Sequence, residues 1–213
     1  MLTTLEILVP PKCEPIDLDL LRRHIRIDHF DDDVLLRGYL AAARSMAEMY
    51  LSRVLVTQTL QWTMQPRDAV WPERHHLHWT LELPRSPVQS IVSIQVNDER
   101  GNETTILPAV LPVVPPAGMH GYKADLAFTP SRVKIGRTTL LIDGRTLSRT
   151  NIESVQVVFV AGYGQPEAIP QPILDAIMLT AAYLYENRGD AGGNEMPRAV
   201  EWLLDPYRIM FLG

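Results

Sequence analysis

Three neighbouring histidines, His75, His76 and His78, are side chains that could bind a metal ion. His76 and His78 are two residues apart, so both would lie on one face of a β-strand. A third ligand such as Glu73 or Glu82 would complete a zinc site, because zinc binds imidazole nitrogens and carboxylate oxygens. The spacing matches no specific zinc motif, however. We therefore favour an exposed β surface or a subunit contact for this cluster, and we predict no metal site.

The four tryptophans, Trp62, Trp71, Trp79 and Trp202, are a second group of candidates. Indole rings can stack on sugars or bases, but three of the four lie in strand-like stretches, where aromatic side chains are common in the core or on a sheet face. We favour core or interface positions for them. A ligand- or carbohydrate-binding module that uses Trp71, Trp79 and the nearby histidines stays open as the alternative function.

Motifs of the common enzyme classes are missing from the sequence. Gly162-Tyr163-Gly164 has neither the spacing nor the lysine of a phosphate-binding loop, and no Gly-x-Ser-x-Gly occurs. The aspartates between Asp28 and Asp33 lack the alternating ligand positions of a calcium loop, so we expect them to start a helix. Cys13, the single cysteine, cannot form an internal disulfide. We predict no enzyme, no catalytic residue and no cofactor.

Composition limits the class of protein further. The 213 residues, of which 46% are hydrophobic and 21% charged, are enough for one large domain or two small ones. A net charge of −5 argues against a protein that binds nucleic acid over a broad surface. No apolar run approaches the ~18 residues of a membrane-spanning helix, and the N-terminal residues lack the pattern of a secretory signal. We therefore expect no membrane association.

Hydrophobic periodicity predicts helices near both ends of the chain. Asp17 is a good N-cap for a first helix that runs to about Ile27. A stripe at helical spacing predicts a second helix before Arg53, with Leu36, Leu40, Ala43, Ala47, Tyr50 and Leu51 on its apolar face. Pro170 and Pro172 favour the start of a third helix, and Met196-Pro197 that of a fourth.

Between these helices the pattern changes to a period of two, which is typical of strands. We expect strands within residues 56–64, 77–83, 92–96, 104–107, 132–135, 139–142 and 154–161, a hairpin turn at residues 98–102 with Gly101 at positive φ, and an exposed loop over residues 110–121. The sequence thus predicts an α+β fold, a small α-helical layer of about four helices with an inserted antiparallel β-domain. Its predicted parts are residues 1–55, the N-terminal helices, residues 56–162, the β-domain, and residues 163–213, the C-terminal helices and tail. The stems at residues 53–56 and 162–165 need only be neighbours.

Several segments together resemble the head-tail connectors, or adaptors, of tailed bacteriophages and of gene transfer agents. The segments are Leu20-Leu21-Arg22-Arg23-His24-Ile25-Arg26-Ile27-Asp28, Asp31-Asp32-Asp33, Tyr39-Leu40-Ala41-Ala42-Ala43-Arg44, Glu48-Met49-Tyr50, residues 53–59, residues 83–91, Phe159-Val160-Ala161-Gly162-Tyr163-Gly164, residues 170–176 and Tyr183-Leu184-Tyr185-Glu186-Asn187-Arg188. Their order and spacing carry the resemblance, which spans nearly the whole chain.

The resemblance implies a structural virion protein that forms a ring, typically twelvefold, beneath the portal of a DNA-filled capsid. The implied partners are the portal protein, neighbouring copies of the chain, and the next tail-side connector or tail terminator. The implied location is the neck at the head-tail junction, with the host cytoplasm during assembly. DNA would pass through the lumen without sequence-specific binding. The negative net charge fits this role, because a strongly basic lumen would hold DNA through counterion release.

The last residues are unusually apolar for a chain terminus, which normally frays. Two interpretations stay open, a tail that folds back on its own helices and a tail that docks on a partner. The resemblance implies that the C-terminal part reaches toward the portal. The predicted docking residues are aromatic or flexible apolar side chains of the kind enriched at interfaces, namely Trp202, Tyr207, Ile209, Met210, Phe211 and Leu212.

Overall fold

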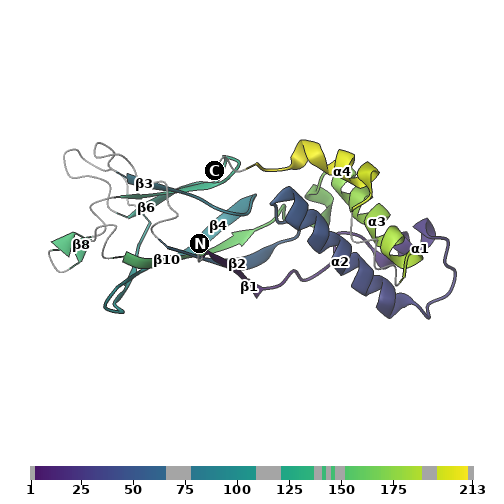
Figure 1. The fold of residues 1–213 in the computed structure, drawn as a ribbon, viewed down its shortest axis with the longest axis horizontal. Helices are drawn as coiled ribbons and strands as arrows, with labels where there is room; N and C mark the ends of the chain where they lie inside the picture. Colours follow the sequence, from purple (N-terminus) through teal and green to yellow (C-terminus); the bar gives the residue numbers. More distant parts are fainter. Residues whose placement is uncertain are drawn as a thin grey trace. The chain divides into compact units, whose positions relative to one another are not determined.

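The structure is a computed structural model that describes residues 3–65, 78–108, 121–136, 141–142, 145–146, 152–188 and 196–210. These residues form four α-helices and three antiparallel sheets (Figure 1). The predicted α+β fold with about four helices is confirmed. The chain divides into two compact units, a β-rich unit of Met1–Pro10 and Gln58–Ala161 and a helical unit of Pro11–Thr57 and Gly162–Gly213.

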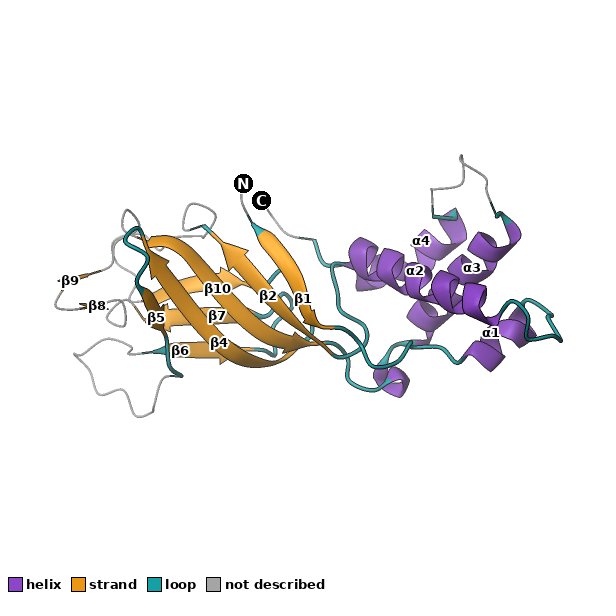
Figure 2. Cartoon of the chain, turned by 90° about the horizontal axis from the view of Figure 1, so that it is seen from below, coloured by secondary structure: helices purple, strands orange, loops and turns teal. Residues whose placement is uncertain are grey.

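A five-stranded antiparallel sheet forms the larger part of the β-rich unit (Figure 2). Its strands, in spatial order, are β1 (Thr4–Val9), β2 (Gln58–Met64), β10 (Ile152–Ala161), β4 (Val88–Asp98) and β5 (Glu103–Thr105). Strand β1 was not predicted, and it takes its residues out of the segment that the sequence analysis had placed with the N-terminal helices. It pairs with β2, so the sheet joins segments that are far apart in the chain.

Alternation of buried and less buried residues along β2 and β10 gives this sheet one core-facing side. Trp62 of β2 lies opposite Val157 of β10, which in turn lies opposite Ile94 of β4, and all three are buried. Such cross-strand apolar pairs are the main source of sheet stability. Val158 and Val160 of β10, on the other side, are only partly buried. The sheet therefore buries one side more completely than the other.

A second, three-stranded sheet has the order β3 (His78–Glu82), β7 (Arg132–Gly136) and β6 (Tyr122–Asp125). Leu81, Tyr122, Val133 and Ile135 are buried side chains of this sheet. Strands β8 (Leu141–Ile142) and β9 (Arg145–Thr146) form a short two-stranded ladder. Strand β6 was not predicted, and the loop predicted over residues 110–121 lies almost wholly outside the described residues.

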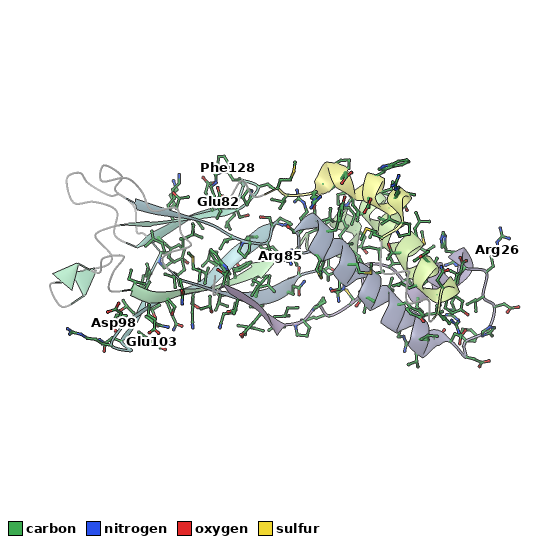
Figure 3. All side chains as sticks on the ribbon, in the orientation of Figure 1. Arg26, Glu82, Arg85, Asp98, Glu103 and Phe128 are labelled. Atoms are coloured by element: carbon green, nitrogen blue, oxygen red, sulfur yellow. The ribbon has the colours of Figure 1, made fainter. Side chains whose placement is uncertain are left out.

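The hairpin predicted between β4 and β5 is present, and Figure 3 labels Asp98 and Glu103 at its two ends. Asp98 Oδ1 accepts from the backbone N–H groups of Arg100 at 2.9 Å and Asn102 at 2.8 Å, and Gly101 has φ +79°. Hydrogen bonds from the Asn102 side chain and backbone hold the pKa of Asp98 below its usual value. The turn residues therefore carry out the role that their types predict.

The helical unit contains α1 (Leu18–His24), α2 (Asp33–Leu51), α3 (Gln171–Glu186) and α4 (Arg198–Leu204), with short 3₁₀ turns η3 (Pro166–Ala168) and η4 (Asp205–Tyr207). Asp17 is the N-cap of α1, because its carboxylate accepts from the Asp19 backbone N–H at 2.8 Å. The helix ends at His24 rather than near Ile27, and Arg26 follows at φ +60°. The predicted stripe of α2 is confirmed by the burial of Leu36, Leu40, Ala43, Ala47 and Leu51.

Residues on both sides of the β-rich segment lie next to each other within the helical unit. The Tyr163 backbone N–H donates to Leu55 O at 3.0 Å, and the Thr57 hydroxyl donates to Gly164 O at 3.3 Å. A β-carbon on Gly162, which has φ +128°, would come within 2.7 Å of Thr57 N. The predicted closeness of the two stems is therefore confirmed, and Gly162 is needed where they meet.

Candidate partner interface

Helix α4 presents one of the predicted docking residues to solvent. Val200 and Leu204 of this helix are buried in the helical core, whereas Trp202 is 73% exposed. Pro197 precedes the helix, and its fixed φ suits a helix start. A large indole ring exposed on a short helix that is anchored by its neighbours is a rigid apolar feature, of a kind common at protein interfaces.

The segment after α4 is held against the helical unit by main-chain contacts. The Ile209 backbone N–H donates to Leu51 O at 3.0 Å, and the Ile209 side chain is only 6% exposed. The Tyr207 carbonyl accepts from Arg53 Nε at 2.5 Å, and the Tyr207 ring packs partly buried against the helical core. Tyr207 and Ile209 therefore fit the first of the two open interpretations, in which the C-terminal residues fold back on the chain's own helices.

Met210, the next residue, is 79% exposed, so the side chains of Ile209 and Met210 differ sharply in burial. Phe211 and Leu212, the remaining predicted docking residues, lie outside the described residues. The exposed apolar side chains that the described part of this region offers to a partner are therefore Trp202 and Met210.

A polar contact fixes the end of α4 to α2. The Tyr50 hydroxyl donates to the Asp205 carboxylate, and this hydrogen bond, together with partial desolvation, raises the pKa of Tyr50. The Arg208 guanidinium lies 4.7 Å from the centre of the Tyr50 ring. Side chains on both sides of the turn at Asp205-Pro206 thus hold it in place, and with it the segment that leads to Met210.

A second polar cluster joins the start of α2 to the end of α3. The Tyr185 hydroxyl donates to Asp32 Oδ2 at 2.5 Å, and Arg188 donates to the same oxygen at 3.1 Å while lying 3.9 Å from the centre of the Tyr185 ring. These two donors, Tyr185 first, lower the pKa of Asp32. Asp32 is the N-cap residue of α2, but its side chain makes no capping hydrogen bond. The helix-start role expected for the aspartates is therefore only part of what Asp32 does.

An ion-pair network joins α2 to the segments before and after it. Arg44 Nε donates to Glu14 at 2.7 Å, and its guanidinium also donates to Glu48 at 2.9 Å. The second oxygen of Glu48 accepts from the Leu55 backbone N–H at 2.9 Å. Burial alone would lower the pKa of Arg44, but the two carboxylates outweigh it and raise that pKa. The network therefore positions the stem at Leu55, and its residues have structural partners instead of facing an open site.

The other candidates from the sequence divide into described and undescribed residues. Trp62 is 7% exposed, in agreement with the core position favoured for it. Trp71, His75 and His76 lie outside the described residues, as do the side chains of His78 and Trp79, so the alternative binding surface stays a hypothesis. Among the described residues, no group of three or more His, Cys, Asp or Glu side chains is placed to hold a metal ion, and no helix is long and apolar enough to cross a membrane.

Comparison with known proteins agrees with the resemblance seen in the sequence. Residues 15–106 match the family model described as "Phage gp6-like head-tail connector protein". This stretch covers α1, α2 and the first strands of the insertion, and the resemblance to head-tail connectors is confirmed. A search of curated proteins gives no match.

Solved structures of gene transfer agent (GTA) particles share the fold over nearly the whole chain. A chain of "Neck of empty GTA particle computed with C6 symmetry" matches with a TM-score of 0.64 and 22% identity, over 98% of this chain and 97% of that chain. A chain of "Virion of native gene transfer agent (GTA) particle" matches with a TM-score of 0.63 and 24% identity over the same shares. A chain of "Neck of native GTA particle computed with C12 symmetry" gives a TM-score of 0.60 and 22% identity, over 100% and 97%. At these identities the matches establish the fold.

Proposed function

We propose that this chain is a head-tail connector, a structural virion protein that forms a ring under the portal, lets DNA pass and offers a docking platform to the next tail component. The observation that carries the proposal is the match of residues 15–106 to the connector family model. The fold shared with GTA neck structures over at least 98% of the chain supports the same role. The proposed role requires no catalysis and no cofactor.

We propose that the ring contains twelve copies of the chain and lies in the neck of the particle. Before assembly, the chain is in the host cytoplasm. The support is the C12 symmetry named for one matched neck structure. The net charge of −5 suits a passage for DNA, because few phosphates would be held by counterion release. We propose that the free chain is largely monomeric and assembles on the portal, so that the ring is ordered by its template.

Portal docking is assigned to the helical unit, with Trp202 and Met210 as the described side chains that make the contact. This assignment is supported because both side chains are exposed, and because contacts of Ile209, Tyr207 and Asp205 hold the backbone of this region in place. Buried Ile209 would act as the anchor of the tail on its own chain. The β-rich unit is left to meet the next tail-side connector or tail terminator.

The proposed function is tested by co-expressing the full chain with a portal protein from the same genome. We expect rings of the chain on the portal in electron micrographs, and a mass of about twelve chains added per portal ring. The chain alone, at low concentration, is expected to sediment mainly as a monomer. A chain that stays monomeric with the portal present and is absent from purified particles would contradict the proposal. A closed ring at all dilutions without the portal would contradict only the template step.

A further inference from the structure

The outer strand β1 of the five-stranded sheet is exposed along its whole length, although it is rich in apolar side chains. All six residues of β1 are exposed, and four of them are Leu5, Ile7, Leu8 and Val9. Figure 2 shows β1 at the margin of the sheet, beside β2. An apolar edge strand left open to solvent is a template for pairing with other chains, which natural proteins usually protect.

The register shows that this apolar edge continues the core-facing side of the sheet. Leu5 lies opposite Trp62 and Ile7 opposite Leu60, and both of these β2 partners are buried. Directly opposite residues of an antiparallel pair share one face of the sheet. Leu5 and Ile7 nevertheless stay 36% and 59% exposed. The core-facing side of the sheet thus extends beyond what this chain covers by itself.

The strand at the opposite edge of the same sheet, β5, is shorter and less apolar. There β5 is only three residues long and begins with a glutamate, and it pairs with β4 without a register shift. Short strands, charges and bulges are the usual protections of a sheet edge. β1 also carries a glutamate, Glu6, and a register shift between Ile7 and Val9, but it is six residues long and has four apolar side chains. The edge strand β1 is therefore longer and more apolar than the edge strand β5.

We propose that β1 is the seam at which the neighbouring copy of this chain docks in the ring, covering Leu5 and Ile7 and completing the apolar side of the sheet. The occupant is a second copy because the proposed connector is a cyclic ring, and each copy in such a ring must present a surface to its neighbour on both sides. In a cyclic ring β1 meets a different surface of the neighbour, whereas β1 meeting β1 would close a dimer. This inference rests on the proposed function.

Site-specific photocrosslinking in the full chain, co-expressed with the portal protein, tests the seam. A benzophenone amino acid replaces Ile7, and the matched control replaces Phe128. Phe128 is 54% exposed in the β-rich unit, near Glu82 in Figure 3 and away from β1 in the sequence, and Arg132 lies 5.5 Å from its ring centre. We expect position 7 to give a ladder of covalent multiples of the chain that extends beyond the dimer, and position 128 to give none.

Every other pattern at position 7 overturns the seam. A product that stops at the dimer indicates that β1 meets β1, and an adduct with another protein indicates a different partner. The absence of any adduct in assembled rings overturns it as well. Micrographs of the same sample show whether rings form. Rings without a ladder of crosslinked products contradict the seam alone, whereas the absence of rings contradicts the proposed function.

Substitutions give an independent measurement of the same contact. Ile7→Lys should lower the fraction of chains in rings by about tenfold or more, because a lysine on a strand edge opposes further association. Phe128→Lys is the matched control and should leave that fraction unchanged. Sedimentation measures the assembled fraction, and the melting temperature of the monomer shows whether each variant is folded. A folded Ile7→Lys chain that assembles as the wild type does would overturn the seam.

Discussion

Gly162 illustrates a constraint that belongs to a single residue. Its φ of +128° is one that side-chain-bearing residues rarely adopt, and a β-carbon there would lie 2.7 to 2.9 Å from backbone atoms of Val56 and Thr57. Backbone atoms cannot move aside as the end of a flexible side chain can. The resemblance had drawn attention to the Gly-Tyr-Gly segment, but only the structure shows which glycine has no room.

We expect Gly162→Ala to destabilise the protein by at least about 2 kcal/mol, because it adds a clash to a strained backbone. Gly38→Ala is the control, since Gly38 lies within α2 and a β-carbon there has nothing within 4 Å. The control should raise the free energy of unfolding by about 0.5 to 1 kcal/mol, because alanine favours helix more than glycine does. Urea unfolding measures both variants. Equal free energies for Gly162→Ala and the wild type would contradict the expectation.

The stability that Asp32 provides should depend on pH. Because the hydrogen bonds from Tyr185 and Arg188 lower its pKa in the folded state below the ordinary 3.8, the stability that they provide is present above that value. It is lost as the pH falls through the lowered pKa, where the carboxylate takes up a proton. Asp32→Asn should therefore be less stable than the wild type near neutral pH, and the difference should shrink in acid.

Unfolding in urea at about pH 7 and about pH 3 measures this difference. Asp31→Asn is the control, because Asp31 is an exposed neighbour in the same acidic run. It should leave the stability almost unchanged at both pH values. A difference for Asp32→Asn that stays constant across the range would show that the ionised carboxylate is not what matters.

At the scale of elements, the strongest sequence patterns were the most reliable. The stripe of α2, the proline-marked start of α3 and the Asp98–Asn102 turn are local signals, and each is present in the structure. Strand β1 was missed although Leu5, Ile7 and Val9 alternate with other residues, because its partner β2 lies beyond two helices in the chain. The cluster of Asp32 with Tyr185 and Arg188 was missed for the same reason, since its members come from opposite ends of the helical unit.

The C-terminal region of the chain divides into a buried anchor, Ile209, and an exposed contact surface, Trp202 and Met210. Stability and binding measurements can separate the two. Ile209→Ala should lower the free energy of unfolding by about 2 to 4 kcal/mol, because it truncates a side chain that is only 6% exposed. Truncation after Pro206 would remove this anchor, so it should cost stability as well as docking. Thermal or urea unfolding checks the first effect, and an unchanged stability of Ile209→Ala would contradict the buried position.

Trp202→Ser combined with Met210→Ser should instead leave folding unchanged within about 0.5 kcal/mol, since both side chains are exposed. We expect this variant to bind the portal at least about tenfold more weakly, because exposed aromatic and methionine side chains are typical interface anchors. The matched control is Met49→Ser, a methionine on α2 that is also exposed. Co-sedimentation with the portal measures the binding, and normal binding of the double variant would place the docking surface elsewhere.

At the scale of the whole molecule, the two units can be tested as separable parts. The helical unit has its own core of buried side chains from both halves of the chain, among them Leu36, Leu51, Ile173, Ile177 and Leu204. Its stems are joined by the hydrogen bonds at Tyr163 and Thr57, so a short linker should be able to replace the β-rich segment.

We expect Pro11–Thr57, connected by a short glycine-serine linker to Gly162–Gly213, to give a soluble helical protein with a cooperative thermal transition. Circular dichroism and sedimentation check the product. The same design with Gly162→Ala is the control and should melt at a lower temperature. A product that is unfolded or aggregated would show that the helical unit depends on the β-rich unit.

The chain enters the helical unit at Pro11, leaves it at Thr57 and returns only at Gly162, which has a consequence for the order of events on the ribosome. Synthesis proceeds from the N-terminus, so α1 and α2 emerge with their apolar faces uncovered and must wait while strands β2 to β10 are made. The β-rich unit already holds all of its segments when Ala161 has been added. Folding during translation should therefore complete the β-rich unit first, and the helical unit, to which portal docking is assigned, should close last.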